Sequence, residues 1–154
     1  MGFKISSINF CPVKSVSFQS INSCKIKKNI GIVGDRIFAF AKGLDLNEVK
    51  LFEKNSEARR GKWNKILTLK NSPVLNKYNF LFNENELTLT FKNEEILKIN
   101  TNELIEHDSL SNKILELEHS LQKPIFLMKN IDFPFFDTSI SNKTVLTHSV
   151  SLLN

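Results

Sequence analysis

The sequence predicts a mainly β protein, α+β overall, in which a small antiparallel β-barrel precedes a helix. Several short segments alternate apolar and polar residues, which is the pattern of a strand with one buried face. Connections of hairpin length and turn chemistry separate some of them, as at residues 83–85 and 92–94. Six or more short strands at this spacing favour a barrel or a sandwich.

The first third of the chain contains three expected strands. They are residues 3–10 with a bulge at Ser6 and Ser7, residues 18–29, and residues 37–41. Residues 45–65 follow without a clear period. Within them, 48–52 suits either a strand or a helical turn. Residues 57–63 form a charged loop, expected to be solvated and anchored by Trp63, with contact to a polyanion as the lesser alternative.

Regular patterning returns at residues 66–69 and continues past a turn that begins at Pro73. Three further strands are expected at residues 80–82, 87–91 and 96–99. Period-two alternation places six apolar side chains in the core of the predicted barrel: Phe10, Phe38, Phe40, Phe80, Leu89 and Ile99.

The pattern changes after residue 100. Leu110, Ile114, Leu117 and Leu121 share one face of a helix that begins near Ser109 and ends before the proline at 124. A strand over residues 124–128 and a helix start at 149–153 complete the chain. We therefore divide the sequence into residues 1–100, the barrel, and residues 101–154.

Charge is unevenly distributed along the chain. Residues 1–80 contain 15 Lys and Arg against 5 Asp and Glu, whereas residues 81–154 contain 6 against 11. A basic first half can steer a phosphorylated small molecule, an acidic partner or a nucleic acid toward the protein. Alternatively, the two halves neutralise each other within one molecule.

Cysteine and histidine spacing argues against a metal site. Cys11 and Cys24 form no C-x-x-C pair, and His107, His119 and His148 show no ligand spacing. A disulfide between the two cysteines is conceivable, although two free thiols in a reducing cytosol are favoured. No apolar run is long enough for a bilayer and no signal-peptide pattern is present, so we expect a cytoplasmic protein without a membrane partner.

Two short stretches predict an anion site. Lys14 and Ser15 follow Pro12, whose ring stiffens the backbone, and Arg36 follows a glycine-bounded turn. If the two segments pair, an ammonium, a hydroxyl and a guanidinium converge, which is the donor set that a phosphate needs. The alternative is that both cations are simply solvated beside their turns.

The turn before Arg36 contains two glycines and an aspartate. Gly31 and Gly34 allow positive φ angles, which let the chain reverse tightly. Asp35 can orient the neighbouring guanidinium or accept hydrogen bonds from backbone amides of the turn. The turn is therefore expected to present Arg36 in a fixed direction.

Pro12-Val13-Lys14-Ser15 followed by Gly31-x-x-Gly34-Asp35-Arg36-x-Phe38 resembles the N-terminal β-barrel domain of MOSC proteins. These are relatives of the molybdenum cofactor sulfurase C-terminal region, including bacterial MOSC oxidoreductases and the mitochondrial amidoxime-reducing component. Weaker matches continue in order at residues 67–75, 87–89, 137–139 and 149–153, so the resemblance covers nearly the whole chain. It implies that residues 1–100 are the MOSC N-terminal-like barrel and that 101–154 begin an incomplete MOSC core.

The resemblance also implies a cofactor, the molybdenum cofactor with its molybdopterin. The residues that match the family's phosphate-holding positions are Lys14, Ser15 and Arg36, and those that match the stretch approaching the cofactor from the core are Asp137, Thr138 and Ser139. No catalytic residue and no metal ligand is implied within the chain, because Cys11 and Cys24 match no ligand position. The family's Arg-Pro-Asn segment and its molybdenum-ligating cysteine are expected after residue 153.

The expected function is therefore cofactor binding as part of a MOSC-type protein. Molybdenum-dependent reduction or sulfur-carrier activity is expected to be absent from this chain alone, and a separate chain supplying the rest of the core, or a redox partner, is implied. Whether the protein is an enzyme is left open. Two alternatives remain: a stand-alone basic barrel that binds a phosphate-bearing ligand or, less favoured, a nucleic acid, and an inactive truncated gene product.

Overall fold

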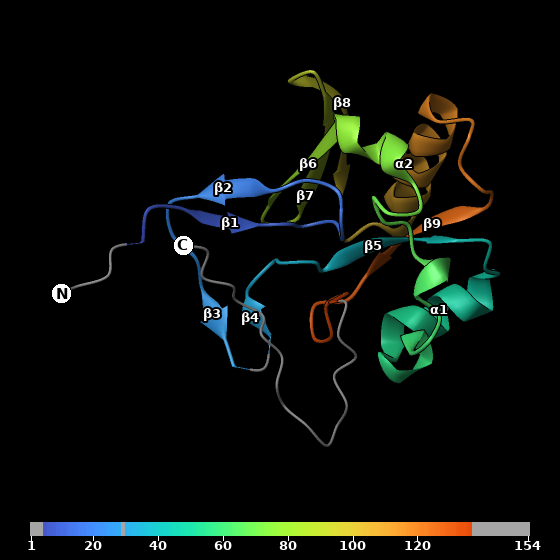
Figure 1. Ribbon diagram of the computed structural model, residues 1–154, viewed down its shortest axis with the longest axis horizontal. Helices are drawn as coiled ribbons and strands as arrows, with labels where there is room; N and C mark the ends of the chain where they lie inside the picture. Colours follow the sequence, from blue (N-terminus) through green and yellow to red (C-terminus); the bar gives the residue numbers. More distant parts are fainter. Residues whose placement is uncertain (1–4, 29, 137–154) are drawn as a thin grey trace.

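A computed structural model of the chain describes residues 5–28 and 30–136 and shows an α+β fold (Figure 1). The strands are β1 (Ile8–Phe10), β2 (Gln19–Ile21), β3 (Ile26–Lys27), β4 (Gly31–Ile32), β5 (Phe38–Lys42), β6 (Tyr78–Asn83), β7 (Glu86–Phe91), β8 (Glu94–Asn100) and β9 (Ile125–Lys129). The helices are α1 (Leu46–Lys54) and α2 (Leu104–Leu117), with the 3₁₀ turns η1 (Glu57–Arg59), η2 (Trp63–Lys65) and η3 (Pro73–Lys77).

The strands form small antiparallel sheets in the orders β1–β2, β3–β4, β5–β9 and β6–β7–β8. The β6–β7–β8 meander confirms the three strands expected between residues 80 and 99. Its two turns contain non-glycine residues with positive φ: Glu84 at 52° in the first, and Lys92 at 51° and Asn93 at 67° in the second. The period-two pattern and the turn lengths were thus sufficient to locate this sheet.

No closed barrel is found within residues 5–28 and 30–136, which corrects the expected architecture. The free edge of β6 lies beside β2, but side chains make the connection. Ser17 Oγ accepts a hydrogen bond from the Phe80 amide at 2.9 Å, and Gln19 Oε1 accepts one from the Phe82 amide at 2.8 Å. These side-chain oxygens accept the hydrogen bonds that the Phe80 and Phe82 amides would otherwise donate to a neighbouring strand. The backbone ladder therefore does not continue from β6 to β2.

Other expected strands are shorter than their patterns suggest. The expected strand over 3–10 is observed as β1 and that over 18–29 as β2 and β3. Residues 66–69, where regular patterning returns, form a single bridge between Ile66 and Ala41. In the last case the Leu67 amide still donates to the Phe40 carbonyl at 2.8 Å. The region therefore follows β5 without forming a regular strand of its own.

Strands β5 and β9 run through the middle of the molecule, with the meander and α2 on one side and α1 on the other (Figure 1). Phe38 lies opposite Lys129, and Lys42 lies opposite Ile125. The pairing confirms the strand expected after the proline at 124. All six predicted core residues are buried, namely Phe10, Phe38, Phe40, Phe80, Leu89 and Ile99.

The main core cluster also contains Ile114 of α2 and Leu127 of β9. Apolar side chains from both sides of residue 100 therefore pack together. The division into residues 1–100 and 101–154 stays a prediction about domain organisation.

Helix α1 resolves the ambiguity of residues 48–52. Asp45 accepts hydrogen bonds from the amides of Asn47 and Glu48 at 2.8 and 2.9 Å, and the Glu48 carboxylate accepts one from the Asp45 amide at 3.2 Å. This capping box satisfies amides that a helix start leaves without partners. The helix buries Val49 and Phe52.

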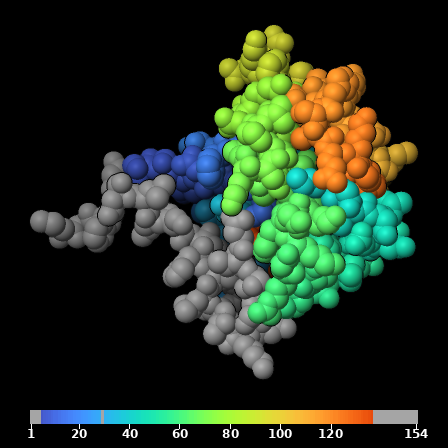
Figure 2. Space-filling model, turned by 45° about the vertical axis from the view of Figure 1, so that its right-hand side comes forward, coloured from blue at the N-terminus to red at the C-terminus, as the bar shows by residue number. Residues whose placement is uncertain are grey.

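Helix α2 begins at Leu104, earlier than the expected start near Ser109. Leu110 and Ile114 of the predicted apolar face are buried, and Leu121 is buried beyond the end of the helix. The segment after α2 (orange in Figure 2) lies against the segment that leads into α1 (cyan). A hydrogen bond of 2.9 Å from the Gly43 amide to the Pro124 carbonyl joins these two segments.

The charged loop at residues 57–63 is not simply solvated, because Arg59 is only 1% exposed. Its guanidinium donates to the carbonyls of Phe52 at 2.6 Å, Glu53 at 3.2 Å and Phe133 at 2.7 Å. It also lies 4.0 Å from the centroid of the Phe135 ring. Arg59 thus ties α1 to the segment after β9.

The part of the chain that the structure describes contains no helix with both the length and the hydrophobicity needed to cross a bilayer.

Candidate functional site

Backbone hydrogen bonds hold the two basic segments side by side. The Arg36 amide donates to the Cys11 carbonyl at 2.6 Å, the Phe38 amide to the Pro12 carbonyl at 3.1 Å, and the Lys14 amide to the Phe38 carbonyl at 2.8 Å. The pairing that the sequence required for Lys14, Ser15 and Arg36 to converge is therefore present.

Both Ser15 and Arg36 have left-handed backbone conformations, with φ angles of 59° and 52°. Such angles are uncommon for residues with a side chain and cost roughly 1–2 kcal/mol each. The glycines that the sequence assigned to the turn have φ angles of 88° at Gly31 and 95° at Gly34. Strained backbone concentrates at functional sites, where the surrounding structure maintains it.

The buried carboxylate of Asp35 connects the two segments. Its Oδ1 accepts a hydrogen bond from the Cys11 amide at 2.8 Å, and its Oδ2 pairs with Nη1 of Arg36. Burial raises the pKa of Asp35, while the Cys11 amide and the Arg36 guanidinium oppose that rise. Asp35 orients Arg36 as expected, and the amide it binds belongs to the facing segment.

Ser15 and Arg36 line a single cavity of about 860 Å³. Its wall consists of Cys11, Ser15, Val16, Ser17, Phe18, Arg36, Trp63, Asn64, Thr68, Leu69, Lys70 and Asn71. The wall includes two cationic residues, Arg36 and Lys70, and no acidic one. Concave surfaces with one sign of charge concentrate ligands of the opposite sign, so this cavity favours an anion.

Lys14 lies behind the cavity wall and is only 1% exposed. Its ammonium sits 5.2 Å from the centroid of the Trp63 ring, and Trp63 lines the cavity. The side chain of Arg36, by comparison, is 30% exposed. The structure thus brings Ser15 and Arg36 to the cavity surface and Lys14 to the layer behind Trp63.

Trp63 and Lys70 are wall residues that the sequence did not assign to the predicted site. Trp63 was expected to anchor a solvated loop, with contact to a polyanion as the lesser alternative, and the structure places it in the cavity wall. The one available signal was its position between Lys62 and Lys65 as the chain's single tryptophan. Asp137, Thr138 and Ser139, the other residues of the predicted site, lie outside the described residues.

Cys11 lines the same cavity but is not arranged as a metal ligand. Its Sγ donates a hydrogen bond to the Val13 carbonyl at 2.8 Å, and burial raises the pKa of the thiol. A ligating sulfur must be deprotonated, so this environment disfavours metal binding. Both cysteines are free, and residues 5–28 and 30–136 contain no group of three or more His, Cys, Asp or Glu suited to a metal.

The residues present therefore fit one end of the implied cofactor. Ser15 and Arg36 provide a hydroxyl and a guanidinium for a phosphate, and the cavity is within the range of about 300–1,000 Å³ typical of small-molecule sites. For the molybdenum end, the described residues offer only Cys11, whose Sγ donates to the Val13 carbonyl, and Cys24, which does not line the cavity. Comparisons with protein-family models, curated proteins and solved structures gave no match for this chain.

Proposed function

We propose that the cavity beside Ser15 and Arg36 binds the phosphate end of molybdopterin, as part of a protein of the MOSC type. The observation that carries this proposal is the meeting of Ser15 and Arg36, from two separate segments, in one cavity whose wall has no acidic residue. The resemblance of residues 12–15 and 31–38 to MOSC proteins supplies the identity of the ligand. On the same basis, residues 1–100 correspond to the family's N-terminal domain, here without a closed barrel in the part that the structure describes, and residues 101–154 to the start of its core.

Each cation has a distinct part in this proposal. Arg36 is oriented through Nη1 by Asp35, which leaves other guanidinium N–H groups to donate to phosphate oxygens. The Ser15 hydroxyl donates beside it. Lys14 adds positive potential from behind Trp63, and Lys70 adds it from the cavity wall.

The phosphate contacts alone predict modest affinity. Charge-assisted hydrogen bonds contribute about 1.5–3 kcal/mol each, and association entropy must be subtracted from their sum. Two or three such bonds therefore give a dissociation constant in roughly the micromolar to millimolar range. When bound, the cofactor supplies the redox chemistry of the family. Residues 1–154 are proposed to bind and orient its phosphate without turnover, and a MOSC core or a redox partner is proposed to complete the reaction.

Trp63 offers a direct test because it is the single tryptophan and lines the cavity. We expect inorganic pyrophosphate and isolated molybdopterin to change its fluorescence on titration. Arg36→Met should weaken binding about tenfold or more, and Arg36→Lys should recover part of the loss, because a lysine keeps the charge but not the planar fork.

Arg60→Met is the matched control, since the Arg60 side chain is 69% exposed and does not line the cavity. Unchanged affinity in a folded Arg36→Met variant would contradict the proposal. In the protein as expressed in cells, pterin fluorescence after oxidation, together with molybdenum by elemental analysis, identifies a copurified cofactor.

The alternative of a stand-alone basic domain rests on the same wall, because Arg36 and Lys70 suit any phosphate. A nucleic acid would reveal itself by a steep fall in affinity with salt. Binding of a single-stranded oligonucleotide at the Trp63 cavity, with no response to molybdopterin, would favour this alternative.

A further inference from the structure

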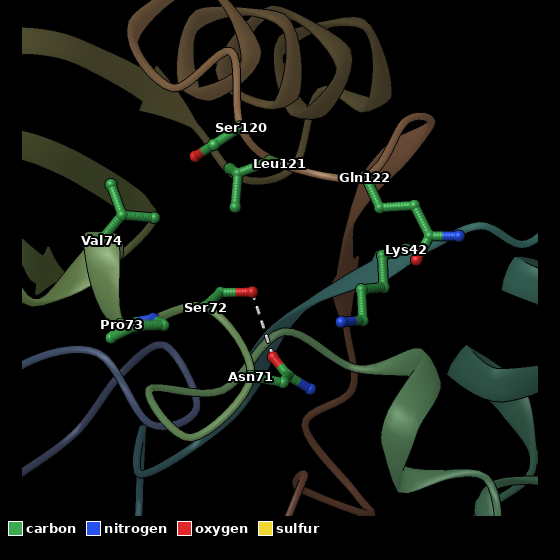
Figure 3. A pocket seen from close by; sticks show the side chains of 8 residues that line it. All are labelled: Lys42, Asn71, Ser72, Pro73, Val74, Ser120, Leu121 and Gln122. Carbon is green, nitrogen blue, oxygen red and sulfur yellow. Dashed lines mark hydrogen bonds between the residues drawn. The ribbon is translucent and has the colours of Figure 1, made fainter.

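A second, smaller cavity of about 300 Å³ lies at the end of β5 (Figure 3). It is lined by Lys42, Asn71, Ser72, Pro73, Val74, Ser120, Leu121 and Gln122. Asn71 lines the larger cavity as well, so the loop around residues 68–72 contributes to both. The function proposed above does not use this smaller cavity.

The wall of the smaller cavity has a polar part and an apolar part. Lys42 provides its single charged group, and its side chain extends toward Asn71 and Ser72 in Figure 3. Ser120 and Gln122, both exposed, are the other polar residues of the wall besides Asn71 and Ser72. The apolar part consists of Pro73, Val74 and Leu121, of which Leu121 is buried.

The loop that forms one wall is fixed by its own hydrogen bonds. Ser72, which is 5% exposed, donates through Oγ to Asn71 Oδ1 at 3.1 Å. The same Asn71 oxygen accepts from the Thr68 amide at 2.9 Å, and Asn71 Nδ2 donates to the Ile66 carbonyl at 2.9 Å. This wall therefore exists before any ligand arrives, which reduces the entropy that binding must overcome.

The side chain of Gln122 lies close to the backbone of Gly43, the residue after Lys42. A Cβ added at Gly43 would lie 2.9 Å from Nε2 of Gln122, and the glycine has a φ of +57°. That φ favours glycine, and the missing side chain leaves room for the exposed end of Gln122 at this side of the cavity.

We propose that this cavity binds a small aliphatic carboxylate. One ammonium in a wall that contains no acidic residue matches a single negative charge, whereas the larger cavity has two cations in its wall. The apolar side chains of Val74 and Leu121 accommodate a short hydrocarbon chain. A volume at the low end of the range for ligand sites restricts the ligand to a small molecule.

The test uses butyrate as the probe and butyramide as its uncharged counterpart. In the methyl-labelled 154-residue chain, we expect butyrate to shift the Val74 and Leu121 methyl resonances with millimolar affinity. Butyramide should bind at least about tenfold more weakly. Lys42→Met should weaken butyrate binding to a similar degree, because it keeps the length of the side chain and removes the charge.

Lys70→Met and Arg36→Met are matched controls in the other cavity and should leave butyrate affinity unchanged. Equal affinity for butyramide, or unchanged affinity in Lys42→Met, would overturn the proposal. If Lys42→Met does not fold, the comparison of butyrate with butyramide in the unaltered protein still decides between the two outcomes. Neither outcome depends on phosphate binding at the larger cavity.

Discussion

Arg59 shows how much structure one side chain can organise. Its guanidinium satisfies the Phe52 and Glu53 carbonyls in the last turn of α1, which have no partner within the helix, and the Phe133 carbonyl after β9. Burial lowers its pKa to about 10, so the group remains charged at neutral pH. Backbone carbonyl oxygens and the Phe135 ring stabilise this buried positive charge.

Replacing Arg59 with methionine is expected to destabilise the fold by about 2–4 kcal/mol, because the carbonyls of Phe52 and Phe133 lose the donor that Arg59 provides. The stability of Arg59→Lys should lie between those of the unaltered protein and Arg59→Met, because one ammonium cannot reach every acceptor. Urea unfolding followed by circular dichroism measures the free energy of unfolding of both variants. Arg60→Met, at a neighbouring exposed position, should change stability by less than about 0.5 kcal/mol. Similar stability of Arg59→Met and Arg60→Met would refute this role for Arg59.

A polar cluster joins Glu118, the residue after α2, to Lys77 at the end of η3 and Tyr78 at the start of β6. Oε1 of Glu118 accepts hydrogen bonds from Tyr78 Oη and Lys77 Nζ, both at 2.5 Å. Burial acts to raise the pKa of Glu118, but the bonds from Lys77 and Tyr78 outweigh it and lower that pKa below its usual value. Burial and the adjacent carboxylate raise the pKa of Tyr78.

A lowered carboxyl pKa gives a pH dependence with a definite sign. The folded state holds the Glu118 carboxylate more strongly than the unfolded chain does, so its stabilisation is complete above the unfolded pKa of about 4.3. It is lost as the pH falls through the lower folded pKa. Urea unfolding between about pH 5 and pH 2 should show this loss.

Glu118→Gln should flatten the acid part of that curve and lower stability at pH 7 by about 1–3 kcal/mol. Glu116→Gln is the control, because Glu116 is exposed and pairs with Lys113 at the surface. If the free energy of unfolding of Glu118→Gln still falls as steeply at acid pH, other carboxylates cause the pH dependence.

At the level of elements, the sequence predicted those strands and turns whose conformation depends on residues close by in the chain. The meander followed from alternation and turn length. The site turn followed from Gly31 and Gly34, whose positive φ angles are observed. Helix α1 remained ambiguous because residues 48–52 are short, although Asp45 and Glu48 already have capping-box spacing.

What the sequence did not reveal depends on distant partners. The barrel was expected to close by strand pairing, yet Ser17 and Gln19 use side chains at the edge of β6. Arg59 reads as a surface charge unless Phe133, in a segment that follows β9, is known to lie beside it. The Lys14–Trp63 contact likewise joins a predicted site residue to the loop at residues 57–63, whose position in the fold the sequence did not predict.

The whole molecule is expected to unfold as one unit. Leu89 of β7 and Ile114 of α2 belong to the same core cluster and are fully buried, although they lie on opposite sides of residue 100. Leu89→Ala and Ile114→Ala should each cost about 2–5 kcal/mol. Both should lower the midpoint of one shared thermal transition. Two separable transitions, each sensitive to one variant, would instead support an independent unit before residue 100.

The pairing of β5 with β9 sets the order in which this fold is completed. Most of the described chain lies between these two strands, so their contact has high contact order and forms slowly. While a ribosome synthesises the protein, the apolar strand Phe38–Lys42 emerges long before its partner Ile125–Lys129. The nascent chain therefore carries an unpaired hydrophobic edge, the form in which aggregation and chaperone capture compete with folding.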